Sequence, residues 1–237
     1  MWVLSRVRAA APRVFVLSLM ALGAAFITAS SLAYFKFDEL PPFVIEKLPL
    51  RFEALWLLSL RVHVVAALIS FPLCIVLMTR ALQRRAVLHR WIGRSAGALI
   101  LFALVPSGAV LSFEAKGGPL VSAGFLLSGA LIAWFMVKGV FAARRREFGA
   151  HRRAMLHVFA QMSVAVTSRA LLFGLDVAGM SPDVAYVVAL WCPVLGSAAM
   201  AELLSGSLKR MVQNHGLKMA MSLRARFVAR PIVRFGR

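Results

Sequence analysis

Four histidines of this chain lie inside or at the edge of long apolar runs. They are His63, His89, His151 and His157. An ionisable side chain within a membrane-spanning segment is costly, and its presence therefore indicates a role. Two imidazoles from different helices can hold a haem iron from opposite sides, and histidine with a carboxylate can hold zinc or iron. The same residue type can also bridge two helices by a hydrogen bond.

Depth along the apolar runs, counted at about 1.5 Å per residue, separates these side chains into two layers. The layer nearer the basic segments contains His89, His151, His157 and Glu202, with Gln161 one turn deeper than His157. His151 and His157 point about 120° apart on a helix, so both cannot bind one ion. For haem we predict His89 with His157 or His89 with His151, and for a metal ion His89, His157 and Glu202. His89 and His151 also fit interfacial residues beside arginines.

The second layer contains Arg61, His63 and Arg169. His63 lies deep in its apolar run and fits either a ligand or a bridge between helices. Arg169 could be held by backbone carbonyls or by Asp176 and Asp183, which follow it. It could equally bind an anionic substrate or a haem propionate.

The elements that must position these residues are membrane-spanning helices. The chain is 61% hydrophobic, with a mean hydropathy of +0.81, and about 20 apolar residues suffice for one helix to cross a bilayer. Backbone groups in lipid must be satisfied internally, so these segments are predicted to be helices. We predict an all-α bundle of six spans at about residues 14–35, 54–78, 92–113, 118–141, 154–174 and 184–206.

The basic residues predict the orientation of this bundle. They cluster before the first span, between spans two and three, between spans four and five, and after span six. The alternate connections contain only Lys36, Lys47, Arg51 and Lys116. The positive-inside rule therefore predicts that both termini are cytoplasmic. Residues 207–237 would form a basic cytoplasmic tail outside the domain of residues 1–206, either disordered or lying on anionic phospholipid headgroups.

Two other features narrow the class of protein. The net charge of +19 alternates with apolar runs and has no basic and aromatic groove motif beside it, which argues against nucleic acid. The chain starts with a basic segment like that of a signal peptide. Its first apolar stretch is longer than the usual 7–15 residues, so we predict an uncleaved anchor.

Cys74 and Cys192 fall within apolar runs and are expected to be reduced.

Several short motifs carry a resemblance to a known family. They are "LHRWIGR" at 88–94, "GG" at 117–118, "HRRAM" at 151–155, and the single residues His63, Arg169, Trp191 and Glu202. At these spacings the chain resembles, over about residues 55–205, the bacterial membrane-protein family catalogued as domain of unknown function 2306. The family usually has Trp-Met after its second His-Arg, and "HRRAM" lacks that tryptophan. The resemblance implies a multi-pass protein of the bacterial inner membrane and brings no established activity.

Three functions remain open from the sequence. The first is a protein that binds haem b or a transition metal through intramembrane histidines, in electron transfer or in respiratory-complex assembly with a membrane-protein partner. The second is a transporter or a lipid- or anion-binding protein in which Arg169 and His63 line a polar pocket. The third is a scaffold without a ligand. Whether the protein is an enzyme is not indicated, because the common catalytic motifs are absent from the sequence.

Overall fold

The computed structural model describes residues 2–35, 42–45, 47–50 and 52–228. Within these residues the chain is helical and has no strand. Six helical segments are long and apolar enough to cross a membrane, which confirms the predicted all-α fold. They are Ala11–Ser31, Glu53–Leu77, Ala86–Ser112, Gly118–Arg144, Phe148–Val177 and Pro182–Gly206.

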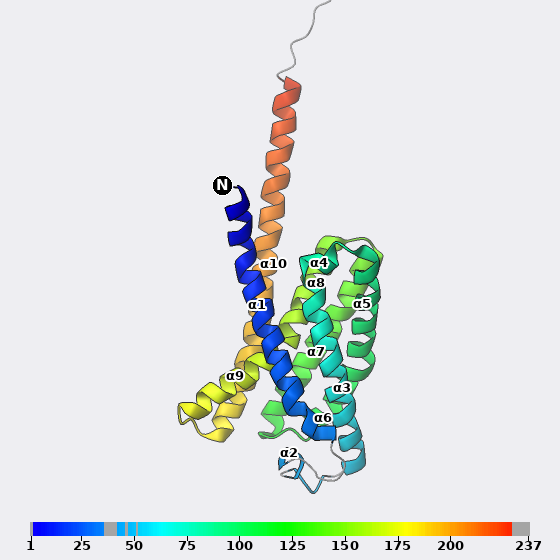
Figure 1. Ribbon diagram of the computed structural model, residues 1–237, viewed down its shortest axis with the longest axis vertical. Coiled ribbons are helices and arrows are strands. Elements are labelled where there is room, and N and C mark those ends of the chain that lie inside the picture. Colours follow the sequence, from blue (N-terminus) through cyan, green and yellow to red (C-terminus); the bar gives the residue numbers. More distant parts are fainter. Residues whose placement is uncertain (1, 36–41, 46, 51, 229–237) are drawn as a thin grey trace, which may run out of the picture.

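Figure 1 shows these elements packed side by side, with short connections at both ends. The helices are α1 (Trp2–Ser31), α2 (Pro42–Ile45), α3 (Glu53–Leu77), α4 (Arg80–Gln83), α5 (Ala86–Leu99), α6 (Val105–Ser112), α7 (Gly118–Arg144), α8 (Phe148–Met162), α9 (Val164–Val177) and α10 (Pro182–Val228). A 3₁₀ turn, η1 (Leu32–Phe35), follows α1, and a π-helical turn, η2 (Ile100–Leu104), joins α5 to α6.

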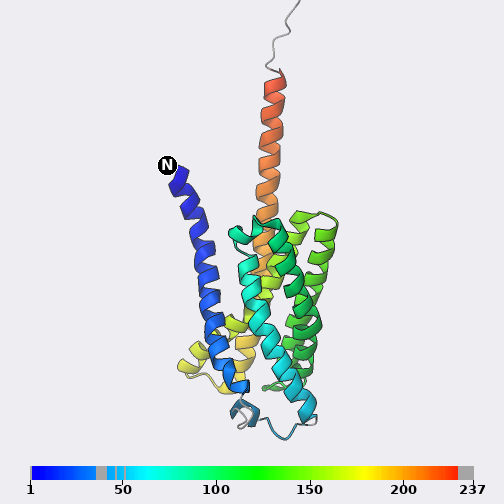
Figure 2. The same ribbon diagram turned by 45° about the vertical axis from the view of Figure 1, so that its right-hand side comes forward.

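Two spans are interrupted. Span three changes from α to π geometry at Ile100–Leu104, just before Pro106, whose missing amide leaves a carbonyl of the preceding turn without its helical partner. Span five breaks at Ser163, although no proline is present there. The Ser163 hydroxyl donates to the Ala160 carbonyl at 2.6 Å, and such hydroxyl-to-backbone bonds favour helix bending. In Figures 1 and 2, α9 and the first turns of α10 lean away from the other helices.

The core is apolar and is formed mainly by α3, η2, α7 and α8. Phe71, Ile100, Met136 and Val158 are buried in its main cluster. A smaller cluster joins α7, α9 and α10. Gly124 of α7 permits close approach of α10, because a side chain at this position would lie 2.7 Å from Leu190. This agrees with the packing role expected of small residues between spans.

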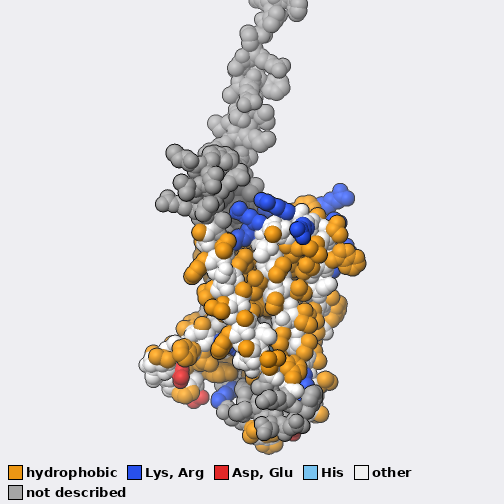
Figure 3. All heavy atoms as spheres, viewed as in Figure 1, with side chains coloured by type: hydrophobic (Ala, Val, Ile, Leu, Met, Phe, Trp, Pro, Cys, Tyr) orange, Lys and Arg blue, Asp and Glu red, His pale blue; other side chains and the backbone are white. Residues whose placement is uncertain are grey.

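The surface has two charged ends and an apolar circumference (Figure 3). At one end, which we call the polybasic end, lie α4, the connection from α7 to α8, and the outer parts of α1 and α10. Helix α10 continues through Val228, so the segment predicted as a separate tail begins as an extension of span six. Exposed large side chains such as Phe102, at 82%, cover the sides, as expected for lipid contact. The cytoplasmic location of the polybasic end stays a prediction.

Candidate histidine sites and a charged pocket

His89 and His151 face each other at the polybasic end. His89 lies on the first turn of α5, and His151 lies on the first turn of α8. Their ring centroids are 6.4 Å apart, and the ring planes are nearly perpendicular, at 86°. Both side chains are half-buried. Two helices that are separate in sequence therefore bring two imidazoles to one place.

A hydrogen bond determines which ring nitrogen of His151 carries the proton. Its Nδ1 lies 2.9 Å from the carbonyl oxygen of Gly139, which can only accept, so Nδ1 donates. In this tautomer the Nε2 of His151 has a free lone pair. Gly139 permits the contact because α8 lies directly against it. A side chain at this position would meet Ala154 at 3.2 Å and would also collide with Met155. Among the described residues, the Nδ1 of His89 is buried and has no hydrogen-bond partner, and the same is true of the Nδ1 of His157.

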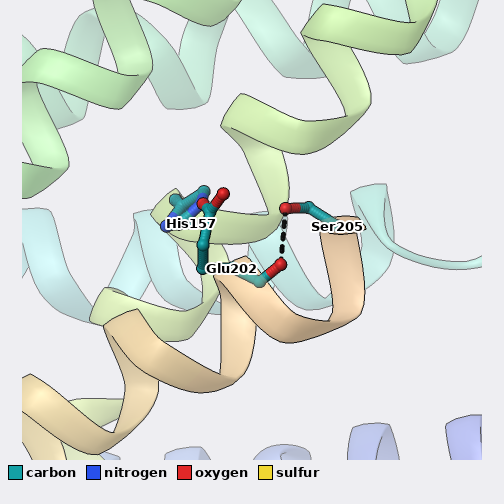
Figure 4. A network of polar contacts seen from close by, with 3 residues as sticks. All are labelled: His157, Glu202 and Ser205. Carbon is teal, nitrogen blue, oxygen red and sulfur yellow. Dashed lines mark hydrogen bonds and ion pairs between the residues drawn. The ribbon is translucent and has the colours of Figure 1, made fainter. Parts of the chain in front are cut away.

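His157 is held on another side of α8. Its Nε2 lies 3.1 Å from a carboxylate oxygen of Glu202 on α10 (Figure 4). One face of its ring stacks on Phe135, with centroids 4.0 Å apart and planes 7° apart. The residue is only 6% exposed, whereas the Glu202 side chain is 77% exposed. The Ser205 hydroxyl donates to the Glu202 backbone carbonyl at 2.9 Å, which leaves the carboxylate to His157.

One turn deeper, Gln161 joins three helices. Its amide nitrogen donates to the carbonyl of Val194 and to the hydroxyl of Ser197, each at 3.0 Å. Its amide oxygen accepts from the hydroxyl of Ser128 at 3.0 Å. Gln161 is 2% exposed. A buried amide with both its donors and its acceptor satisfied stabilises and orients the helices that it joins.

His63 lies in the other half of the bundle and bridges α3 to the interrupted span three. Its Nδ1 donates to the carbonyl of Leu104 at 3.1 Å and lies 3.3 Å from the hydroxyl of Ser107. A side chain at Gly108 would lie 2.9 Å from the imidazole, so glycine allows this approach. The contacts of His63 are those of a hydrogen bond between helices.

Arg169 lies on α9 and lines a cavity of about 390 Å³ at the end opposite the histidine pair. One nitrogen of its guanidinium donates to the carbonyl of Ala165 at 2.8 Å. This is one of the arrangements predicted from the sequence, whereas Asp176 and Asp183 line the same cavity without an ion pair to Arg169 among the described residues. His63 is not among the residues that line this cavity.

The predicted site residues are thus divided among separate places. His89 meets His151, and His157 meets Glu202. The proposed set of His89, His157 and Glu202 does not come together as a metal site, and the described part of the chain contains no group of three or more His, Cys, Asp or Glu side chains that could hold an ion. The sequence analysis did not identify Phe135 and the Gly139 carbonyl as partners of His157 and His151. No sequence signal could have identified a backbone oxygen as a partner.

Comparison with known proteins gives one match. Residues 60–205 match the model of the family described as "Predicted membrane protein (DUF2306)". The chain belongs to this family. The match confirms the resemblance predicted from the sequence, and its range includes all six residues of the histidine sites and the pocket arginine: His63, His89, His151, His157, Arg169 and Glu202. No curated protein and no solved structure matches this DUF2306 member.

Proposed function

We propose that this DUF2306 protein binds haem b near the polybasic end of its membrane domain, with His89 and His151 as the two axial ligands, and that it acts in electron transfer. The observation that carries the proposal is the meeting of two imidazoles from α5 and α8 at 6.4 Å between centroids. A haem whose two axial positions are both filled by protein can exchange electrons but has no open position for a substrate.

The separation of the rings suits one iron between them. A bond of about 2 Å from each imidazole nitrogen to the metal places the centroids of two opposed rings about 6 Å apart. The Nδ1 of His151 already donates to the Gly139 carbonyl, an outer hydrogen bond of the kind that normally orients a metal-binding histidine. The unsatisfied nitrogen of His89 costs free energy unless a further group binds the ring.

The number of ligands favours haem over a bare ion. Zinc sites use at least three protein ligands, and the described residues contain no such group. Haem supplies four nitrogens of its own and needs only two from the protein. Exposed arginines lie next to both histidines in sequence and could pair with the two propionates. They are Arg90, Arg94, Arg152 and Arg153.

Absorbance tests this proposal. The protein is purified in detergent from haem-replete cells, and its Soret band and metal content are measured. We expect a Soret band that is weakened or shifted by His89→Ala and by His151→Ala and lost in the double variant. His63→Ala and His157→Ala serve as controls and should retain the band if they fold.

Three results would overturn the proposal. A protein that stays colourless after hemin is added would exclude haem. An unchanged band in both single variants would exclude His89 and His151 as ligands, and loss of the band in folded His157→Ala would move the site to the other predicted pair.

A separate observation favours the second function predicted from the sequence. Arg169 lines a cavity of about 390 Å³, so binding of an anionic group is supported at the opposite end. This binding does not involve His63, and it requires no passage of a solute through the bundle.

A further inference from the structure

The cavity at Arg169 is formed by three segments that are distant in sequence. Lys116 and Gly117 come from the connection before α7, Arg169 and Asp176 from α9, and Asp183 from the start of α10. Gly117 adopts a left-handed conformation, with φ of +96°, which allows the chain to turn into α7 beside the cavity. The interruption at Ser163 leaves α9 leaning outwards (Figure 1). The cavity lies between α9, the start of α10 and the connection before α7, since its lining residues come from these segments.

One face of α9 supplies both charge and apolar surface to this cavity. Arg169, Leu172, Phe173 and Asp176 all line it, at the three- and four-residue spacings that place side chains on a single helix face. The positive group therefore lies two turns from the negative group, with apolar side chains between them. Phe173 is 72% exposed, so the apolar part of this face is open.

Arg169 and the two aspartates that line the cavity form no ion pair with one another among the described residues. Arg169 is instead hydrogen-bonded to a backbone carbonyl. Figure 3 shows acidic and basic side chains close together at this end, in contrast to the basic surface at the other. A ligand that carries both charges would satisfy both sets of groups at once.

We propose that this cavity binds the headgroup of a zwitterionic phospholipid that has a primary ammonium, of the phosphatidylethanolamine type. Arg169 binds the phosphate, since guanidinium groups form strong paired hydrogen bonds to phosphate oxygens. The ammonium donates to the carboxylates of Asp176 and Asp183. Leu172 and Phe173 contact the apolar part of the lipid.

The position of the cavity favours a lipid over a soluble molecule. It lies at the ends of two spanning segments, which finish at Val177 and begin again at Pro182, and so at the depth of the headgroups. Tyr186, which also lines it, is of a type enriched at that depth. The inference is independent of haem binding at the other end.

Lipid competition tests the proposal. The purified protein is exchanged into detergent with equal amounts of phosphatidylethanolamine, phosphatidylcholine and phosphatidylglycerol, and retained lipid is measured by native mass spectrometry. We expect phosphatidylethanolamine to be retained about tenfold over the other two, the ratio given by one charge-assisted hydrogen bond. Arg169→Gln should lower retention of all three lipids. The double variant Asp176→Asn, Asp183→Asn should remove only the preference.

Arg61→Gln is the matched control, because Arg61 is an arginine at a similar depth in α3 that does not line the cavity. It should leave retention unchanged. Equal retention of phosphatidylethanolamine and phosphatidylglycerol would overturn the role of the carboxylates. Equal retention of phosphatidylcholine would overturn the need for an ammonium that donates. Displacement of the lipid by soluble phosphoethanolamine at equal concentration would show that a free zwitterion is the ligand instead.

Discussion

His151 and His157 lie on the same helix, α8, but their surroundings differ because they lie on different sides of it. His151 is half-buried, faces a second imidazole, and has one nitrogen fixed by a backbone carbonyl. His157 is buried, is covered by Phe135 on one ring face, and is closed by the carboxylate of Glu202. The first arrangement places the imidazole of His151 against a second imidazole, whereas the second joins α8 to α10 through Nε2 of His157, whose Nδ1 is buried and has no hydrogen-bond partner among the described residues. The proposed binding site and the contact between α8 and α10 therefore use the same residue type on two sides of one helix.

The largest effect on stability is expected at Gln161, on the α10 side. Gln161→Leu removes three buried hydrogen bonds and leaves the hydroxyls of Ser128 and Ser197 without this partner. Hydrogen bonds in membrane proteins contribute about 0.6 kcal/mol on average and up to about 1.7, so the free energy of unfolding should fall by about 2 kcal/mol. Unfolding in sodium dodecyl sulfate measures this change. Ser128→Ala, which removes one of these bonds, should have about a third of the effect.

A smaller loss is expected at His157. His157→Leu removes the stack on Phe135 and the bond to Glu202, at a cost of about 1 kcal/mol in the same unfolding measurement. If haem binds on the His151 side of α8, as proposed, then His157→Leu should leave the haem absorbance unchanged. If the Soret band disappears while the protein stays folded, then the α10 side contains the ligand and the contrast is wrong.

The smallest effect is expected at Glu202. The side chain is 77% exposed, and in Glu202→Gln the amide oxygen can still accept from His157. The change in unfolding free energy should be below about 0.5 kcal/mol, as for most exposed charge pairs. Thermal unfolding at low and high salt measures it. A larger loss would show that the charge of Glu202, and not only its oxygen, is needed beside His157.

The sequence predicted the fold and the depth of each polar residue, because both follow from the hydropathy of a segment and the rise of a helix. On that basis His157 and Glu202 were placed in one layer, and Arg169 in the other. Depth does not determine which neighbour a helix faces. The choice between His151 and His157 as the partner of His89 therefore needed the packing of α5, α7 and α8, which depends on close approach at Gly139.

The interruption of span five was not predicted, for a related reason. Hydropathy is continuous through residues 154–174, and no proline or glycine marks Ser163 as a break. Whether a serine in a helix bends it depends on its hydroxyl bonding to the backbone and on packing around it. The cavity at Arg169 exists because α9 departs from the line of α8, so it could not be located from sequence either.

The same break decides how the two ends of the molecule are mechanically connected. In span five, we do not expect a displacement of α9 to be transmitted to α8, because the helix changes direction at Ser163. Helix α10 stays helical through Pro193, and it contains Asp183 near its start and Glu202 near its middle, about 28 Å apart at 1.5 Å per residue. We expect a tilt that the bilayer imposes on α10 at Asp183 to move Glu202 and, through its hydrogen bond, His157.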